Sequence, residues 1–283
     1  MTGLVVWHNS ATNETQTWGM NGSRIERRLT ALDEQGKPIF VGPPWFIVGA
    51  FEKKIFWHNS DTHETQIWFM NLDKISRRAT VVDENNEPIF IAPPWHIVGV
   101  GNINAAQELG HPHQGDIVWH NENTQETQVW IMNDEGHKIA RRVTILDENR
   151  QPIFVGMPWH IVGTWTRTIA WHNDETNETQ IWVLNGDQIA RRVTVQDENG
   201  KPIFVGPPWH TFGMTDFNAD PLHHNQNGDI LWYNDDTHET QIWLLNDNGD
   251  RISLRMTVQD EHGETIFVGP PWRIATCADG GLV

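Results

Sequence analysis

The stretch "WHNSDTHETQIWFMN" at residues 57–71 decides the fold, because the chain contains five versions of it. The other four begin at Trp7, Trp119, Trp171 and Trp232, and read "WHNSATNETQTWGMN", "WHNENTQETQVWIMN", "WHNDETNETQIWVLN" and "WYNDDTHETQIWLLN". A sequence motif that recurs at intervals of roughly 50 to 60 residues is the signature of a repeat architecture. Of the 16 tryptophans, all but Trp165 occupy fixed places in these repeats, so the aromatic content belongs to the repeated unit.

Each repeat is predicted to form four antiparallel strands. Segments such as "ETQIWFM" alternate with period two and place large groups on both faces. Turn residues follow in "NGDQ" and "DENG", where a short extra hairpin would fit, and the prolines of "VGPPW" exclude a helix. Four-stranded units that bury both faces against neighbours are typical of a β-propeller, and five units predict five blades.

The phase of the repeats predicts how the propeller closes. The chain starts on a second strand and ends on a first strand, so the strand near Ile274 should pair with the strand near Val5. Such closure leaves no open sheet edge. We expect one domain, 1–283, because the repeats cover nearly the whole chain. Its repeats span about 1–45, 46–95, 96–159, 160–209 and 210–272, and a C-terminal strand at 273–278 completes the first blade.

The segments "PPWHIVGVGN…GDIVWHN…ETQVWIMN" and "PPWHTFGMTDFNAD…NGDILWYN" resemble the FG-GAP/VCBS-type repeat. This resemblance implies a propeller, and the relatives of this repeat, like five-bladed propellers of the tachylectin type, include sugar-binding lectins. The chain departs from the family at its calcium loop, which is shortened to "FEKK" and "WTRT" in two repeats and lengthened in two others.

The composition excludes several partners. A formal net charge of −17 repels nucleic acid and anionic lipid, and no apolar run approaches the length of a membrane span. With Cys277 as the single cysteine, an internal disulfide is excluded. The first residues do not resemble a signal peptide, so a cytoplasmic location is expected, with release by another route left open.

A polar and aromatic set returns five times at one end of the predicted propeller, which we call the top. Aromatic faces together with amide and carboxylate groups are suited to stacking on sugars and bonding their hydroxyls. The asparagines, and the threonines of the same loops, also suit a structural role in their turns, and most tryptophans suit the core. The predicted ligand-binding set is His8, Asn9, Glu14 and Trp45; His58, Asn59, Glu64 and Trp95; His120, Asn121, Glu126 and Trp159; His172, Asn173, Glu178 and Trp209; and Tyr233, Asn234, Glu239 and Trp272.

Paired arginines recur in four repeats, as in Arg77–Arg78, and the last repeat has Leu254–Arg255. Neighbours on a strand face opposite sides, so the two arginines of a pair do not form one clamp. Asp-Glu pairs such as Asp83–Glu84 are their expected partners, in ion pairs between blades.

The opposite end, the bottom, carries two long unrepeated loops. Their histidines and carboxylates are zinc ligands by type, and "DFNAD" resembles part of a calcium loop. A bound metal is one interpretation, and a polar loop without metal is the other; the fold itself requires no cofactor. The candidate metal residues are His111, His113, Asp216, Asp220, His223 and His224.

These patterns predict a multivalent lectin that binds glycans or glycoconjugates and has no catalytic residues. Five nearly equal copies are unlike an active site, which needs one asymmetric arrangement. Two alternatives stay open: a protein-interaction scaffold, and an enzyme that uses the axial cavity or the histidine-rich loops. Tyr233 in place of a histidine, and Arg273 in place of His96, indicate that blade five differs from the others.

Overall fold

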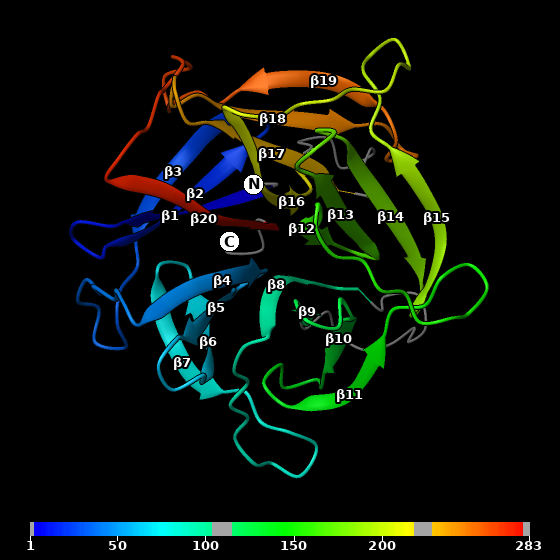
Figure 1. The fold of residues 1–283 in the computed structure, drawn as a ribbon. Helices are drawn as coiled ribbons and strands as arrows, with labels where there is room; N and C mark the ends of the chain where they lie inside the picture. Colours follow the sequence, from blue (N-terminus) through cyan, green and yellow to red (C-terminus); the bar gives the residue numbers. More distant parts are fainter. Residues whose placement is uncertain (1–2, 104–114, 218–227, 280–283) are drawn as a thin grey trace.

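The computed structural model describes residues 3–103, 115–217 and 228–279. It contains five four-stranded antiparallel sheets around a central axis, and the first strand of each sheet lies nearest to that axis (Figure 1). These first strands are β4 (Trp45–Phe51), β8 (Trp95–Gly101), β12 (Trp159–Trp165), β16 (Trp209–Thr215) and β20 (Trp272–Asp279). The predicted five-bladed propeller is confirmed.

The remaining strands follow outward from the axis in chain order. The second strands are β1 (Gly3–Asn9), β5 (Lys54–Asn59), β9 (Asp116–Asn121), β13 (Thr168–Asn173) and β17 (Asp229–Asn234). The third strands are β2 (Thr15–Asn21), β6 (Thr65–Asn71), β10 (Thr127–Met132), β14 (Thr179–Asn185) and β18 (Thr240–Leu245). The outermost strands are β3 (Arg24–Thr30), β7 (Lys74–Thr80), β11 (Ile139–Thr144), β15 (Gln188–Thr194) and β19 (Ile252–Thr257).

We number the blades from the N-terminal end: blade 1 is β20 with β1–β3, and blades 2 to 5 are β4–β7, β8–β11, β12–β15 and β16–β19. Blade 1 is the one that closes the propeller. Its inner strand β20 comes from the C-terminal end and pairs with β1, with Ile274 opposite Trp7 and Cys277 opposite Val5. The predicted closure is therefore confirmed, and it covers what would be an open edge of β1.

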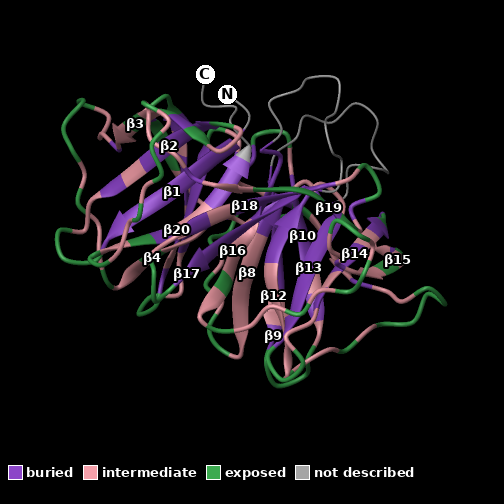
Figure 2. Cartoon of the chain, turned by 90° about the horizontal axis from the view of Figure 1, so that it is seen from above, coloured by how far each residue is buried: buried purple, intermediate pink, exposed green. Residues whose placement is uncertain are grey.

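Each blade packs both faces against neighbours, which explains why both faces of its strands carry large side chains. The tryptophan face of a blade is directed at the preceding blade: Trp57 and Trp68 of blade 2 pack on Leu4 and Val6 of blade 1. Burial accordingly follows the strands, and exposed residues gather in the turns and crossing segments (Figure 2).

Between an outermost strand and the next blade, the chain makes the short hairpin expected at the "DENG"-type turn. In blade 1, Leu32 bridges Pro38 within this hairpin and also bridges Lys74 of blade 2. The hairpin therefore ties one blade to the next before the chain enters a new inner strand. No helix among the described residues is long and apolar enough to cross a membrane.

Candidate functional site

The five predicted asparagines are part of the scaffold of the top loops. Each is buried, and its Oδ1 accepts hydrogen bonds from the backbone N–H groups two and three residues further along. For Asn9 these donors belong to Ala11 and Thr12, both at 2.9 Å. The side chain thus replaces a backbone acceptor inside a tight turn, which is the turn role that the sequence allowed.

The predicted histidines point toward the following blade. His58 lies edge-on to Trp119 with 6.2 Å between ring centroids, and its Nδ1 is 3.0 Å from Thr65 Oγ1. Similar contacts recur for His8, His120 and His172. Burial lowers the pKa of all four imidazoles, so they are neutral at pH 7 and join blades as aromatic groups.

Blade 5 fills the same position with Tyr233. Its ring lies edge-on to Trp7 at 6.5 Å, which completes the series of contacts around the propeller. Its hydroxyl donates to the Val268 carbonyl oxygen at 2.9 Å and also lies 2.9 Å from His238 Nδ1. The substitution therefore keeps the interblade packing and replaces the threonine contact by a different polar one.

The predicted glutamates belong to a polar network on the tryptophan face of each blade. In blade 1, Glu14 Oε1 accepts from Gln16 Nε2 at 2.9 Å and from Thr30 Oγ1 at 2.8 Å. Gln16 Oε1 in turn accepts from Trp18 Nε1 at 3.1 Å. The same three bonds occur in every blade. The second carboxylate oxygen, Oε2, has no hydrogen-bond partner among the described residues.

An arginine covers the tryptophan of this network. The guanidinium of Arg28 lies 4.7 Å from the centre of the Trp18 ring and forms an ion pair of 3.3 Å with Glu261, which precedes blade 1 in the crossing segment. All five blades repeat both contacts, in the pairs Arg28–Glu261, Arg78–Glu34, Arg142–Glu84, Arg192–Glu148 and Arg255–Glu198. The predicted ion pairs between blades are therefore confirmed for the second arginine of each pair and for Arg255.

A groove opens where this arrangement meets the preceding blade. Between blades 5 and 1, a cavity of about 460 Å³ is lined by Gln16, Trp18 and Arg28 on one side. Phe267, from the crossing segment that follows blade 5, and Trp272, the first residue of β20, also line it. Glu14 does not line the cavity, but its carboxylate accepts the hydrogen bond from Gln16 Nε2. This volume is within the range of roughly 300–1,000 Å³ that is usual for small-molecule sites.

The groove has exposed aromatic surface. Phe267 is 59% exposed, and the equivalent phenylalanine is exposed to a similar degree at every other interface: Phe40, Phe90, Phe154 and Phe204. The tryptophans that begin the inner strands are half-buried, whereas those of the second and third strands are buried. Of the predicted tryptophans, Trp272 lines this groove and Trp45 lines a different cavity near the axis.

The bottom of the propeller gives no metal group among the described residues. Asp216 is buried there, and Asp220, His111, His113, His223 and His224 lie outside the described part of the chain. Asp229 is fully buried, and its oxygens accept backbone hydrogen bonds from Phe217 and Leu245, both at 2.9 Å. In residues 3–103, 115–217 and 228–279, no three His, Cys, Asp or Glu side chains are placed to hold a metal ion.

The ligand-binding set predicted from the sequence does not contain the arginine or the phenylalanine of the groove, whereas the glutamine belongs to the polar pattern from which that set was drawn. A sequence signal was present for the glutamine and its tryptophan. In "ETQ-x-W", period-two alternation places Glu, Gln and Trp on one face, and the register of β2 with β3 sets Arg28 opposite Trp18. The phenylalanine of "PIF" gave no such signal, because its exposure depends on how the crossing segment lies over the blade.

No family model and no curated protein sequence matches the chain. Among solved structures, it is similar to a chain of a nidogen/laminin complex, with 10% identity, 98% of each chain covered and a TM-score of 0.45. It is also similar to a functionally unknown protein from Desulfotomaculum acetoxidans, with 10% identity, 90% and 79% covered and a TM-score of 0.43. At these scores the likenesses carry no information about what this five-bladed propeller binds.

Proposed function

We propose that the chain is a multivalent carbohydrate-binding protein whose sugar sites are the grooves between its blades. One observation carries the proposal: the Glu–Gln–Trp network and its arginine recur in all five blades, every crossing segment carries an exposed phenylalanine, and between blades 5 and 1 the two line one cavity. A structural role accounts for the buried tryptophans and the ion pairs. It gives no reason for the phenylalanine that is exposed at the same position of all five repeats.

The chemistry of the groove suits a saccharide. Phe267 and Trp272 offer aromatic faces for the apolar side of a sugar ring. Gln16 and Arg28 offer a side-chain amide and a fixed set of N–H donors for its hydroxyls. The resemblance of the repeats to FG-GAP/VCBS-type propellers, whose relatives include lectins, supports the same function.

Because the site residues are repeated, the protein can bind a glycan surface tightly even if each single site is weak. Several equal sites that engage one glycan-bearing surface together gain about 10²–10⁴ in apparent affinity over one site. Grooves with the same residues at five interfaces therefore suit dense glycan surfaces better than single sugars in solution.

A glycan array followed by titration calorimetry tests this function. We expect a sugar from the array to bind with a stoichiometry well above one per chain. Phe267→Ala should lower that stoichiometry by one site, because it removes the stacking surface of the groove between blades 5 and 1. Leu254→Ala is the matched control, since Leu254 is 50% exposed and does not line that groove.

Two results would contradict the proposal. A stoichiometry of one would point to an unrepeated site. Binding of no glycan, together with capture of a protein by the phenylalanine positions, would make the chain an interaction scaffold.

A further inference from the structure

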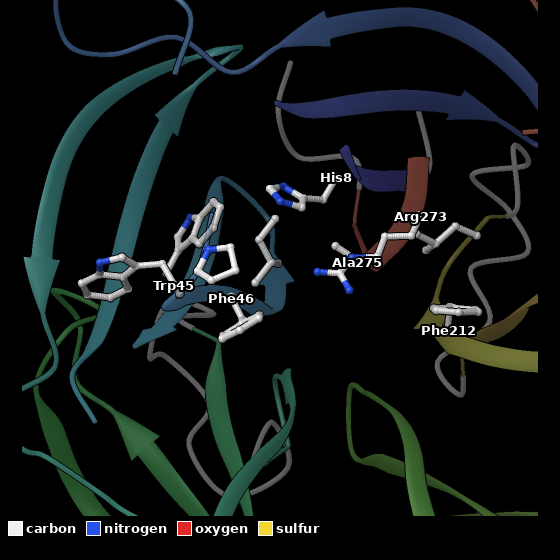
Figure 3. Close-up of a pocket in the computed structure, with 10 residues that line it drawn as sticks. His8, Trp45, Phe46, Phe212, Arg273 and Ala275 are labelled. Carbon is white, nitrogen blue, oxygen red and sulfur yellow. The ribbon is translucent and has the colours of Figure 1, made fainter. Parts of the chain in front are cut away.

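A second cavity lies near the axis at the top of the propeller. Its volume is about 270 Å³, and it is lined by His8, Arg273 and Ala275 of blade 1, Trp45 and Phe46 of blade 2, and Phe212 of blade 5, among others (Figure 3). This volume is at the lower limit of ordinary ligand sites, so the cavity suits a small group.

Arg273 belongs to blade 1, not to blade 5 as the sequence indicated, and it distinguishes this cavity from the corresponding places in the other blades. At the same place in the inner strand, blades 3, 4 and 5 have histidines, each beside an acidic residue of the top loop: His96–Glu122 at 3.4 Å, His160–Asp174 at 3.3 Å and His210–Asp235 at 3.0 Å. In blade 1 the loop position is Ser10, whose hydroxyl donates to the Pro271 carbonyl oxygen. Arg273 therefore has no acidic partner among the described residues.

None of the side chains that line the cavity is a carboxylate. Arg273 supplies a permanent cation. Trp57 lines the cavity, and its buried indole N–H has no acceptor among the described residues, as in the other four blades. His8 uses its Nδ1 on Thr15 and has a pKa lowered by burial and then by Arg273, so it stays neutral. A cavity that contains a cation and no carboxylate is complementary to an anion.

The rest of the wall is apolar. Phe46 and Phe212 come from strands on different sides of the axis, and the Arg273 side chain extends between them (Figure 3). A ligand whose anionic group pairs with the guanidinium would place its body against these rings. A fork of N–H donors matches the two oxygens of a carboxylate, which favours that anion.

We propose that this axial cavity is a single site for a small carboxylate ligand with a ring-shaped body, held by Arg273. The site is independent of the grooves between blades, because Arg273 does not line the groove cavity. It gives one binding event per chain, whereas the residues of the proposed groove recur in all five blades.

Calorimetric titration with benzoate and with glucuronate tests the site, with benzyl alcohol and glucose as their uncharged counterparts. We expect a stoichiometry of one for a carboxylate and weaker binding of its neutral counterpart. Arg273→Gln should weaken carboxylate binding by about tenfold or more, since a hydrogen-bonded ion pair is lost. Preference for benzoate or for glucuronate identifies an aromatic or a sugar body.

Two further variants make the test specific. Ser10→Asp supplies the acid that blades 4 and 5 have at this loop position, so it should pair with Arg273 and block carboxylates while the cation is kept. Arg251→Gln removes an equal charge from an exposed residue outside the cavity and should change nothing. Binding of neither carboxylate, equal binding of a carboxylate and its uncharged counterpart in both pairs, or unchanged carboxylate binding in Arg273→Gln or Ser10→Asp, would overturn the proposal.

Discussion

Glu178 shows how one side chain serves the scaffold and the proposed groove together. Its Oε1 accepts from Thr194 Oγ1 at 2.5 Å, joining the third strand to the fourth, and from Gln180 Nε2 at 2.9 Å, which orients the amide of the groove. The Oε2 atom has no partner among the described residues. A change at this residue therefore has to be measured in stability as well as in binding.

We expect Glu178→Ala to lower the free energy of unfolding by about 1–2 kcal/mol, because two half-buried donors lose their acceptor. Glu178→Gln keeps an acceptor oxygen and should cost less. Thermal melting measures the difference, at about 2–4 °C for each kcal/mol. Glu175→Ala, at an exposed position of the same loop, is the control. Equal melting temperatures for the two alanine variants would show that the network contributes nothing.

The buried histidines predict a dependence of stability on pH. Burial lowers the pKa of His8, His58, His120 and His172 in the folded chain, whereas in the unfolded chain it is near 6.5. Below about pH 6.5 the unfolded chain therefore binds more protons, so the free energy of unfolding decreases as pH falls toward the folded-state pKa.

Calorimetry at constant ionic strength from pH 8 to 5.5 measures this effect. The melting temperature should be level above pH 7 and should decrease below about 6.5. His120→Tyr should flatten the decrease, since Tyr233 already fills this position in blade 5. A melting temperature that rises on acidification would show that other groups dominate.

At the residue scale, the sequence predicted which positions repeat better than what each side chain does. The turn role of the asparagines follows from local chemistry, and the structure places them accordingly. The direction of the histidines does not follow from local chemistry. It depends on which face of the blade meets the following blade, and that is a property of tertiary packing.

Among the elements, the inner strands are shaped by close contact at the axis. In blades 2 to 5 the pairing of the inner strand with its neighbour shifts register just before a glycine, namely Gly49, Gly99, Gly163 and Gly213. A Cβ added at Gly99 would meet Thr164 Oγ1 of the next inner strand at 2.4 Å. These glycines let adjacent inner strands approach, which is a packing reason for the "VG" of the repeats.

We expect Gly99→Ala to destabilise the protein by about 1–3 kcal/mol, since the inserted methyl group overpacks the axis. The cost should fall when Thr164 is also replaced by alanine, because most of the clash is with its side chain. Denaturant unfolding of the four variants gives the coupling between the two sites. Strictly additive effects would mean that the strands do not press on each other at Gly99.

Strand number and order could be predicted because the period-two pattern and the turn residues are local signals. The register shifts could not be predicted, because they depend on a contact between strands of different repeats. The same limit applies to the short hairpin before each inner strand. Its turn residues were visible, but the bridge from Leu32 to Lys74 of the next blade depends on how the blades are arranged.

For the whole molecule, the repeats that build the ring also create two kinds of candidate site. The residues of the proposed interblade grooves recur in all five blades. The axial cavity collects residues from blades 1, 2 and 5, so it can differ from its counterparts through one substitution such as Arg273. The sequence indicated both the repetition and the unusual position, and the cavities themselves required the assembled blades.

Closure of the ring predicts the consequence of losing β20. Trp7 is only 1% exposed and belongs to the same buried cluster as Ile274 and Cys277 of that strand. Deleting residues 272–283 would uncover this cluster and leave β1 as an open edge. Exposure of one such aromatic group costs about 3–5 kcal/mol, a large part of the roughly 5–15 kcal/mol that stabilises a typical domain. We therefore expect the truncated chain to lose its cooperative thermal transition and to associate through the open edge.

Deletion of residues 280–283 alone, which follow β20, is the control and should melt like the full chain. Circular dichroism melts with light scattering measure both, and a 272–283 deletion that stays monomeric with an unchanged melting temperature would show that the ring does not depend on this strand.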